Sequence, residues 1–82
     1  MLDLYVSETC PYCRKVMDFT DKNKIMYNKF DVANDDNVLR LLTFGGIDQV
    51  PFLYDSKSDK RLYESDKIID YLKSVCGVDD EK

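Results

Sequence analysis

The chain has 82 residues, which is enough for one folded domain with one modest core. Its residues are 44% hydrophobic and 34% charged, and the formal net charge is -4, so the composition indicates an ordinary globular domain without a nucleic-acid or membrane partner. There is no histidine, which excludes Ser-His and Cys-His relays and removes the commonest metal ligand.

The first part of the chain predicts a βαβ unit. The segment "LDLYV" (2–6) alternates in polarity and predicts a strand. A helix should begin at Cys10 and Pro11, because proline is well suited to the first turn of a helix. The segment "IMYNKFDV" (25–32) predicts a second strand. The inner face of the helix is expected to carry Val16, Met17 and Thr20.

The second part predicts a helix, a hairpin and a final helix. The segments 34–46 and 65–77 are predicted to be helices. Each starts with a residue pair that favours a helix N-terminus, Asn/Asp or Ser/Asp, and each ends with glycine. Between them, "VPFLYD" (50–55) and "KRLYE" (60–64) predict two short strands joined by a polar turn. The tail 78–82 should fray, and residues 1–77 should form one α/β domain. The expected buried faces are Val38, Leu41 and Leu42 on the earlier helix, and Ile68, Ile69, Leu72, Val75 and Cys76 on the last.

The stretch "CPYC" (10–13) carries the clearest chemistry in the sequence. A helix N-terminus offers N–H groups and a positive dipole end, which lower a cysteine pKa from about 8.5 to roughly 3.5–7.5. Cys10 should therefore be the attacking thiolate, and Cys13, one turn later, can resolve a mixed disulfide formed on it. Arg14 and Lys15 should add positive charge, which Glu8 partly opposes.

The cysteines also have three other interpretations: a structural disulfide, a zinc site and a coincidental pair of core residues. The N-terminus lacks the features of a secretory signal, so we expect a cytoplasmic location, where a structural disulfide is disfavoured. A zinc site needs four ligands, and only Cys76 remains beside the pair, so no metal is expected. The two cysteines could also be buried core residues that have this spacing by coincidence. The proline and tyrosine between them, in a loop from strand to helix, make a buried pair improbable. Cys76 itself should be a small buried hydrophobe of the last helix.

The chain resembles the glutaredoxins, through "SETCPYC" (7–13), Val50 with Pro51, and "YESDKIIDYL" (63–72) in the expected order. The "QVPFL" and "ES" elements are most similar to the branch of glutaredoxins related to glutathione S-transferases, which continues into an all-helical second domain. The resemblance implies a thioredoxin-like α/β fold, with a four-stranded mixed sheet flanked by three helices.

The resemblance also implies a glutathione site. Val50 would pair through its backbone with the cysteine of glutathione, before a cis peptide bond to Pro51, and Tyr12 would border the groove. The γ-glutamyl end would be bound at the start of the last helix, by Glu64, Ser65 and Asp66. Each residue has a simpler interpretation: a trans proline at a strand edge, helix capping, or an exposed aromatic. The chain also departs from the small glutaredoxins, with Ser7 and Val38 at positions that are often basic or amide, and Gln49 at a threonine position.

These features predict a monomeric, glutathione-dependent thiol-disulfide oxidoreductase that acts on protein disulfides and glutathionylated proteins. Glutathione would be its co-substrate. The nearest alternative is a thioredoxin-like reductant recharged by a flavoprotein reductase, which needs no glutathione groove. A third possibility is a carrier of an iron-sulfur cluster, in which Cys10 and glutathione would ligate the cluster. Such carriers generally have serine in place of the resolving cysteine. A catalytically silent interaction module would have no reason to keep both thiols.

Overall fold

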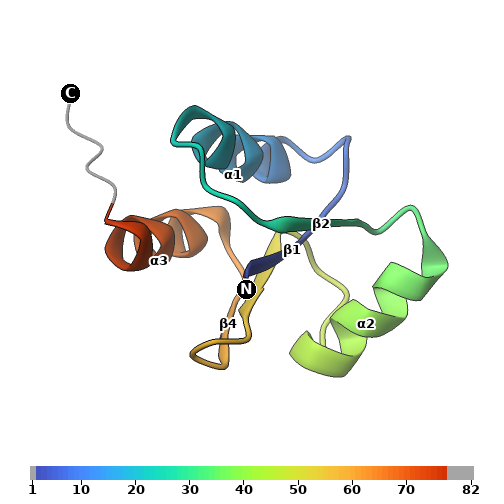
Figure 1. Cartoon of the computed structure of the whole chain (residues 1–82). Helices are drawn as coiled ribbons and strands as arrows, with labels where there is room; N and C mark the ends of the chain where they lie inside the picture. Colours follow the sequence, from blue (N-terminus) through green and yellow to red (C-terminus); the bar gives the residue numbers. More distant parts are fainter. Residues whose placement is uncertain (1, 78–82) are drawn as a thin grey trace.

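The computed structural model describes residues 2–77, which form one mixed sheet with three helices (Figure 1). The sheet order is β2-β1-β3-β4, where β1 pairs parallel with β2 and antiparallel with β3, and β3 pairs antiparallel with β4. The predicted thioredoxin-like fold is therefore confirmed. The elements are β1 (Leu2–Val6), α1 (Pro11–Lys22), β2 (Asn28–Asp31), α2 (Asp35–Gly45), β3 (Phe52–Asp55), β4 (Lys60–Leu62) and α3 (Ser65–Cys76).

The side chains of β1 point alternately to the two faces of the sheet, and each face carries its own core cluster. Leu4 and Val6 are buried in a cluster with residues of α1 and α3, whereas Tyr5 is buried with Leu41 of α2 and Phe52 of β3. Successive side chains of a strand point to opposite faces, so one strand can supply both clusters. Accordingly, α1 and α3 lie on one side of the sheet and α2 on the other (Figure 1).

Strand β2 is shorter than the predicted strand over 25–32. The backbone N–H of Ile25 donates to the carbonyl of Thr20 (2.9 Å), so Ile25 completes the end of α1 instead of joining the sheet. Pairing with β1 begins only at Asn28, opposite Asp3. The apolar residues Ile25 and Tyr27 are partly buried against the core from this connecting segment, which explains why they resembled a strand.

Helix α2 has the predicted ends but a narrower buried face. The side chain of Asn34 accepts the N–H of Asp36 (2.8 Å), which caps the start of the helix. Only Leu41 is fully buried, while Val38 is partly buried and Leu42 is exposed. The prediction for Leu42 was wrong, because consecutive helical residues are turned by about 100° and Leu42 therefore points away when Leu41 faces the sheet.

Helix α3 differs from the prediction at both ends. Its N-cap is Glu64, without a side-chain capping bond, so Ser65 is the first helical residue rather than the cap. Ile68, Ile69 and Leu72 are buried as predicted.

The last turn of α3 contradicts the predicted burial of Val75 and Cys76. Both residues are exposed. The helix runs away from the loop that joins β1 to α1, and its last turn passes beyond the core residues of the earlier turns (Figure 1). Cys76 is therefore an accessible thiol and not a core hydrophobe. The predicted frayed tail, 78–82, lies outside the described residues.

Candidate functional site

Cys10 occupies the N-cap position of α1, as predicted, directly before Pro11. Its thiol is partly buried. This burial raises the pKa of Cys10, but hydrogen bonds from the backbone of Cys13, the Cys13 thiol and the backbone of Tyr12 lower it by more. The net pKa therefore lies below the ordinary value of a cysteine, because donors at a helix start stabilise the thiolate.

Cys13 lies one turn further along α1 and is fully buried. Burial raises the pKa of its thiol to about 12, and the neighbouring Cys10 adds to the increase, although the backbone N–H of Ser7 opposes it. That N–H donates to the Cys13 sulfur at 3.4 Å. The pair is therefore asymmetric: Cys10 favours the thiolate, and Cys13 is a protonated donor beneath it.

The basic residues of the first turn of α1 pair with carboxylates, and neither is among the groups that shift the pKa of Cys10. Arg14 lies 3.9 Å from Glu8, which is also bonded to Lys29 of β2. Lys15 pairs with Asp66 at the start of α3. The low pKa of Cys10 therefore comes from hydrogen-bond donors rather than from these side-chain charges. The contact of Lys29 with Glu8 could not be predicted from local sequence, because the parallel pairing of β1 with β2 creates it.

A groove of about 280 Å³ opens beside the start of α1. It brings together all six residues that were predicted to contact glutathione, from three separate parts of the chain. The peptide bond between Val50 and Pro51 is cis, as the resemblance implied. The lining residues are Tyr12, Gln49, Val50, Pro51, Glu64, Ser65 and Asp66.

The two walls of the groove differ in character. Tyr12 is 64% exposed and lies on α1, two residues after Cys10, rather than in the preceding loop. Opposite the α1 side, Ser65 and Asp66 belong to the first turn of α3, where backbone N–H groups have no partner within the helix. A helix start of this kind attracts anions, while the Asp66 carboxylate attracts cations. The groove can therefore receive a ligand that carries both charges.

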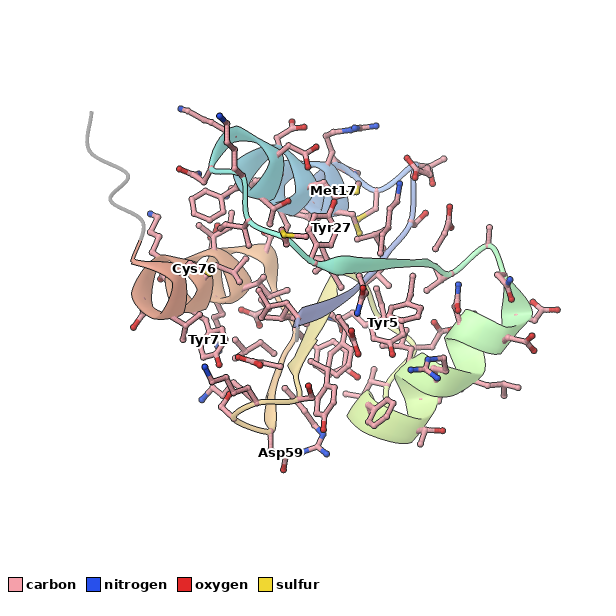
Figure 2. All side chains as sticks on the ribbon, viewed as in Figure 1. Tyr5, Met17, Tyr27, Asp59, Tyr71 and Cys76 are labelled. Carbon is pink, nitrogen blue, oxygen red and sulfur yellow. The ribbon has the colours of Figure 1, made fainter. Side chains whose placement is uncertain are left out.

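A second cavity, of about 540 Å³, lies at the other end of α3 and includes Cys76. Its polar groups are bonded to one another, since the Tyr71 hydroxyl donates to the Asp55 carboxylate (2.6 Å) and lies 2.7 Å from the Ser58 hydroxyl. Figure 2 shows Tyr71 and Cys76 on this helix. Among residues 2–77, His, Cys, Asp and Glu side chains form no group of three or more that could bind a metal.

No helix within the described part of the chain has the length and apolar character needed to cross a bilayer.

Comparison with known proteins places the chain in a family. The family model described as "Glutathione S-transferase, N-terminal domain" matches residues 4–75. No curated protein matches the sequence. The apo form of human glutathione-S-transferase T1-1 is similar over 98% of this chain and 34% of its own, at 30% identity and a TM-score of 0.82. The chain thus spans about a third of the length of this transferase.

Two structures with bound glutathione are also similar. Human glutathione transferase theta-2, in complex with glutathione and an unknown ligand, matches 98% of this chain and 33% of its own, at 25% identity and a TM-score of 0.83. Glutaredoxin 2 from Salmonella typhimurium, in complex with glutathione, matches 94% of this chain and 34% of its own, at 23% identity and a TM-score of 0.77, and so supports the fold alone. The chain, with its thioredoxin-like fold and Cys10–Cys13 pair, belongs to the glutathione S-transferase N-terminal domain family.

Proposed function

We propose that this domain is a glutathione-dependent thiol-disulfide oxidoreductase of the glutaredoxin type, which reduces glutathionylated proteins and protein disulfides. One observation carries the proposal: a thiol with a lowered pKa, Cys10, caps α1 two residues before Tyr12, which lines a groove that can take a zwitterionic ligand. A transferase that only activates glutathione would not need the second, buried thiol of Cys13.

Glutathione fits the groove by its chemistry. Its γ-glutamyl carboxylate would accept hydrogen bonds from backbone N–H groups at the start of α3, near Ser65. Its ammonium would face the Asp66 carboxylate. Its cysteine would lie along Val50, as a short strand added to the domain. This orientation directs the glutathione sulfur toward the α1 side of the groove, where Cys10 precedes Tyr12.

In the proposed reaction, the Cys10 thiolate attacks the glutathione sulfur of a glutathionylated protein. The protein sulfur leaves as a thiolate and takes a proton from water, and Cys10 remains in a mixed disulfide with glutathione. A second glutathione, as thiolate, attacks the glutathione sulfur of this intermediate, which regenerates the Cys10 thiolate and releases glutathione disulfide. The net reaction consumes one free glutathione, whose sulfur is oxidised as it joins the glutathionyl group taken from the substrate, while the protein sulfur is reduced to a thiol.

For a protein disulfide, Cys13 would complete the exchange. Once Cys10 is part of a mixed disulfide, its negative charge is lost, and the pKa of Cys13 should fall from about 12 because one of the groups that raise it has been neutralised. The Cys13 thiolate then attacks the Cys10 sulfur and releases the second substrate thiol. Two glutathione molecules reduce the resulting Cys10–Cys13 disulfide.

The test compares two electron sources for reduction of one glutathionylated peptide. One reaction contains glutathione, glutathione reductase and NADPH, and the other contains thioredoxin reductase and NADPH. We expect turnover with the first source and little with the second. Turnover only with thioredoxin reductase would establish the alternative reductant and refute the glutathione-dependent function.

A further inference from the structure

Tyr63 links the two sides of the groove through its hydroxyl group. This hydroxyl donates to the carbonyl of Ile47 (2.9 Å) and accepts the backbone N–H of the same residue (3.1 Å). Ile47 lies between the end of α2 and the segment of Gln49 and Val50, which forms one wall of the groove. Tyr63 directly precedes Glu64, where the other wall begins. A single side chain therefore connects the backbone of both walls.

The ring of Tyr63 is held firmly in place. It packs against Phe52 with ring centroids 4.7 Å apart, in the cluster on the α2 side of the sheet. Space for its hydroxyl exists because residue 45 is glycine: a Cβ atom there would lie 2.0 Å from the Tyr63 oxygen. Gly45 and Tyr63 are thus matched in shape, and a side chain at residue 45 would displace the hydroxyl from Ile47.

The backbone at Glu64 makes the position of Tyr63 important for the ligand. Glu64 has a φ of 56°, a region that residues with a side chain rarely adopt and that surrounding contacts must maintain. This residue turns the chain from β4 into α3 and sets the direction of the first turn of α3. An anchor at the adjacent Tyr63 helps to fix that turn relative to Val50.

We infer that Tyr63 is a positioning residue, which holds the Val50 wall and the Ser65 wall at the separation that the ligand requires. The identity of the ligand as glutathione rests on the proposed function. Tyr63 contributes no group to sulfur chemistry, because its hydroxyl is bonded to Ile47 on the α2 side of the sheet. Its loss should therefore weaken glutathione binding without changing the reactivity of Cys10.

The experiment compares Tyr63→Phe with the control Tyr54→Phe. Both tyrosines belong to the same cluster, and both variants keep the ring. Within residues 2–77, however, the Tyr54 hydroxyl donates to the exposed Asp59 (3.1 Å), which does not line the groove. We expect Tyr63→Phe to raise the apparent KM for glutathione several-fold, with kcat at saturating glutathione and the alkylation rate of Cys10 unchanged. Tyr54→Phe should change none of them. An unchanged KM in Tyr63→Phe, or an equal increase in both variants, would overturn the inference.

A second readout needs no glutathione. Amide hydrogen exchange should accelerate at Ile47 and Gln49 in Tyr63→Phe, and also in Gly45→Ala, because the added methyl group displaces the Tyr63 hydroxyl. Unchanged exchange in both variants refutes the anchoring role. If the wild-type domain shows no activity with glutathione but exchange accelerates as expected, the proposed function fails while the role of Tyr63 in the loop stands.

Discussion

Lys15 and Asp66 form an ion pair of 2.5 Å between α1, which carries both thiols of the site, and α3, which forms one wall of the groove. Their side chains are 55% and 80% exposed, so the pair contributes little to stability. It does occupy the carboxylate that we assign to the glutathione ammonium. In the proposed complex, Lys15 would share the Asp66 carboxylate with the ammonium or move aside.

Variants of Asp66 and Lys15 distinguish a contact between Asp66 and glutathione from the ion pair between these two residues. We expect Asp66→Asn to raise the apparent KM for glutathione several-fold, because the ammonium loses its partner, while the reactivity of Cys10 stays the same. Lys15→Gln is the matched control, since it breaks the same ion pair but keeps the carboxylate, and its KM should not rise. Equal increases in both variants would mean that the ion pair matters, and not a contact between Asp66 and glutathione.

Alkylation against pH tests the asymmetry of the two thiols. In a Cys76→Ser background, the rate at Cys10 should increase with pH through a pKa below the ordinary cysteine value and then level off, because the thiolate is the reactive form. Cys13 should stay unreactive until strongly alkaline pH, since its pKa is about 12 and its thiol is buried. Mass spectrometry after each time point assigns the modified cysteine. Parallel titration of both thiols would contradict the hydrogen-bonded arrangement.

Single cysteine variants test the division of labour. Cys10→Ser should abolish disulfide exchange, because the attacking thiolate is gone. Cys13→Ser should keep turnover of glutathionylated peptides, since external glutathione can resolve the mixed disulfide, but should slow the reduction of protein disulfides. The measurement is steady-state turnover on both substrate types. If Cys13→Ser loses activity on glutathionylated peptides as completely as Cys10→Ser, the glutathione-resolved route is wrong.

The buried hydroxyl of Tyr5 predicts that its removal does not lower the stability of the fold. Tyr5 is fully buried between the sheet and α2, where it stacks on Phe30 at 4.8 Å, and its hydroxyl finds no partner among residues 2–77 (Figure 2). Removing an unpaired buried hydroxyl recovers a desolvation penalty, so Tyr5→Phe should leave the free energy of unfolding unchanged or raise it by about 1 kcal/mol.

Tyr71→Phe provides the contrast, because its hydroxyl is bonded to the buried Asp55. Denaturant unfolding of this variant should give a lower free energy of unfolding than the wild type. A loss in Tyr5→Phe as large as that in Tyr71→Phe would show that the Tyr5 hydroxyl does have a stabilising partner.

Local sequence signals predicted the position of Cys10 at the start of α1, because proline follows it. The apolar spacing of Val16 and Met17 indicated which side of the helix faces the sheet, but the full burial of Cys13 was not predicted. The same periodicity failed for Cys76, because a helical pattern shows which residues share a face but not where the helix passes the edge of the core.

The groove could be predicted only through the family resemblance. No local signal brings Val50 next to Ser65, or indicates the cis bond before Pro51, since these depend on how β3 and α3 pack. Tyr63 escaped prediction for a related reason. Its contact with Ile47 requires close approach to Gly45, and a tyrosine at the end of a short strand is otherwise typical of a half-buried sheet residue.

Locating one glutathione adduct tests most directly whether Cys10 is the thiol that exchanges with glutathione. Cys13→Ser protein is mixed with limiting glutathione disulfide below pH 7, and the modified residue is identified by peptide mass spectrometry. Cys76 provides the internal comparison, because it is the more exposed of the two remaining thiols. We predict glutathione on Cys10 and little on Cys76, since the hydrogen-bonded thiolate should outcompete the more accessible thiol. Glutathione mainly on Cys76, or on neither cysteine, would contradict the account.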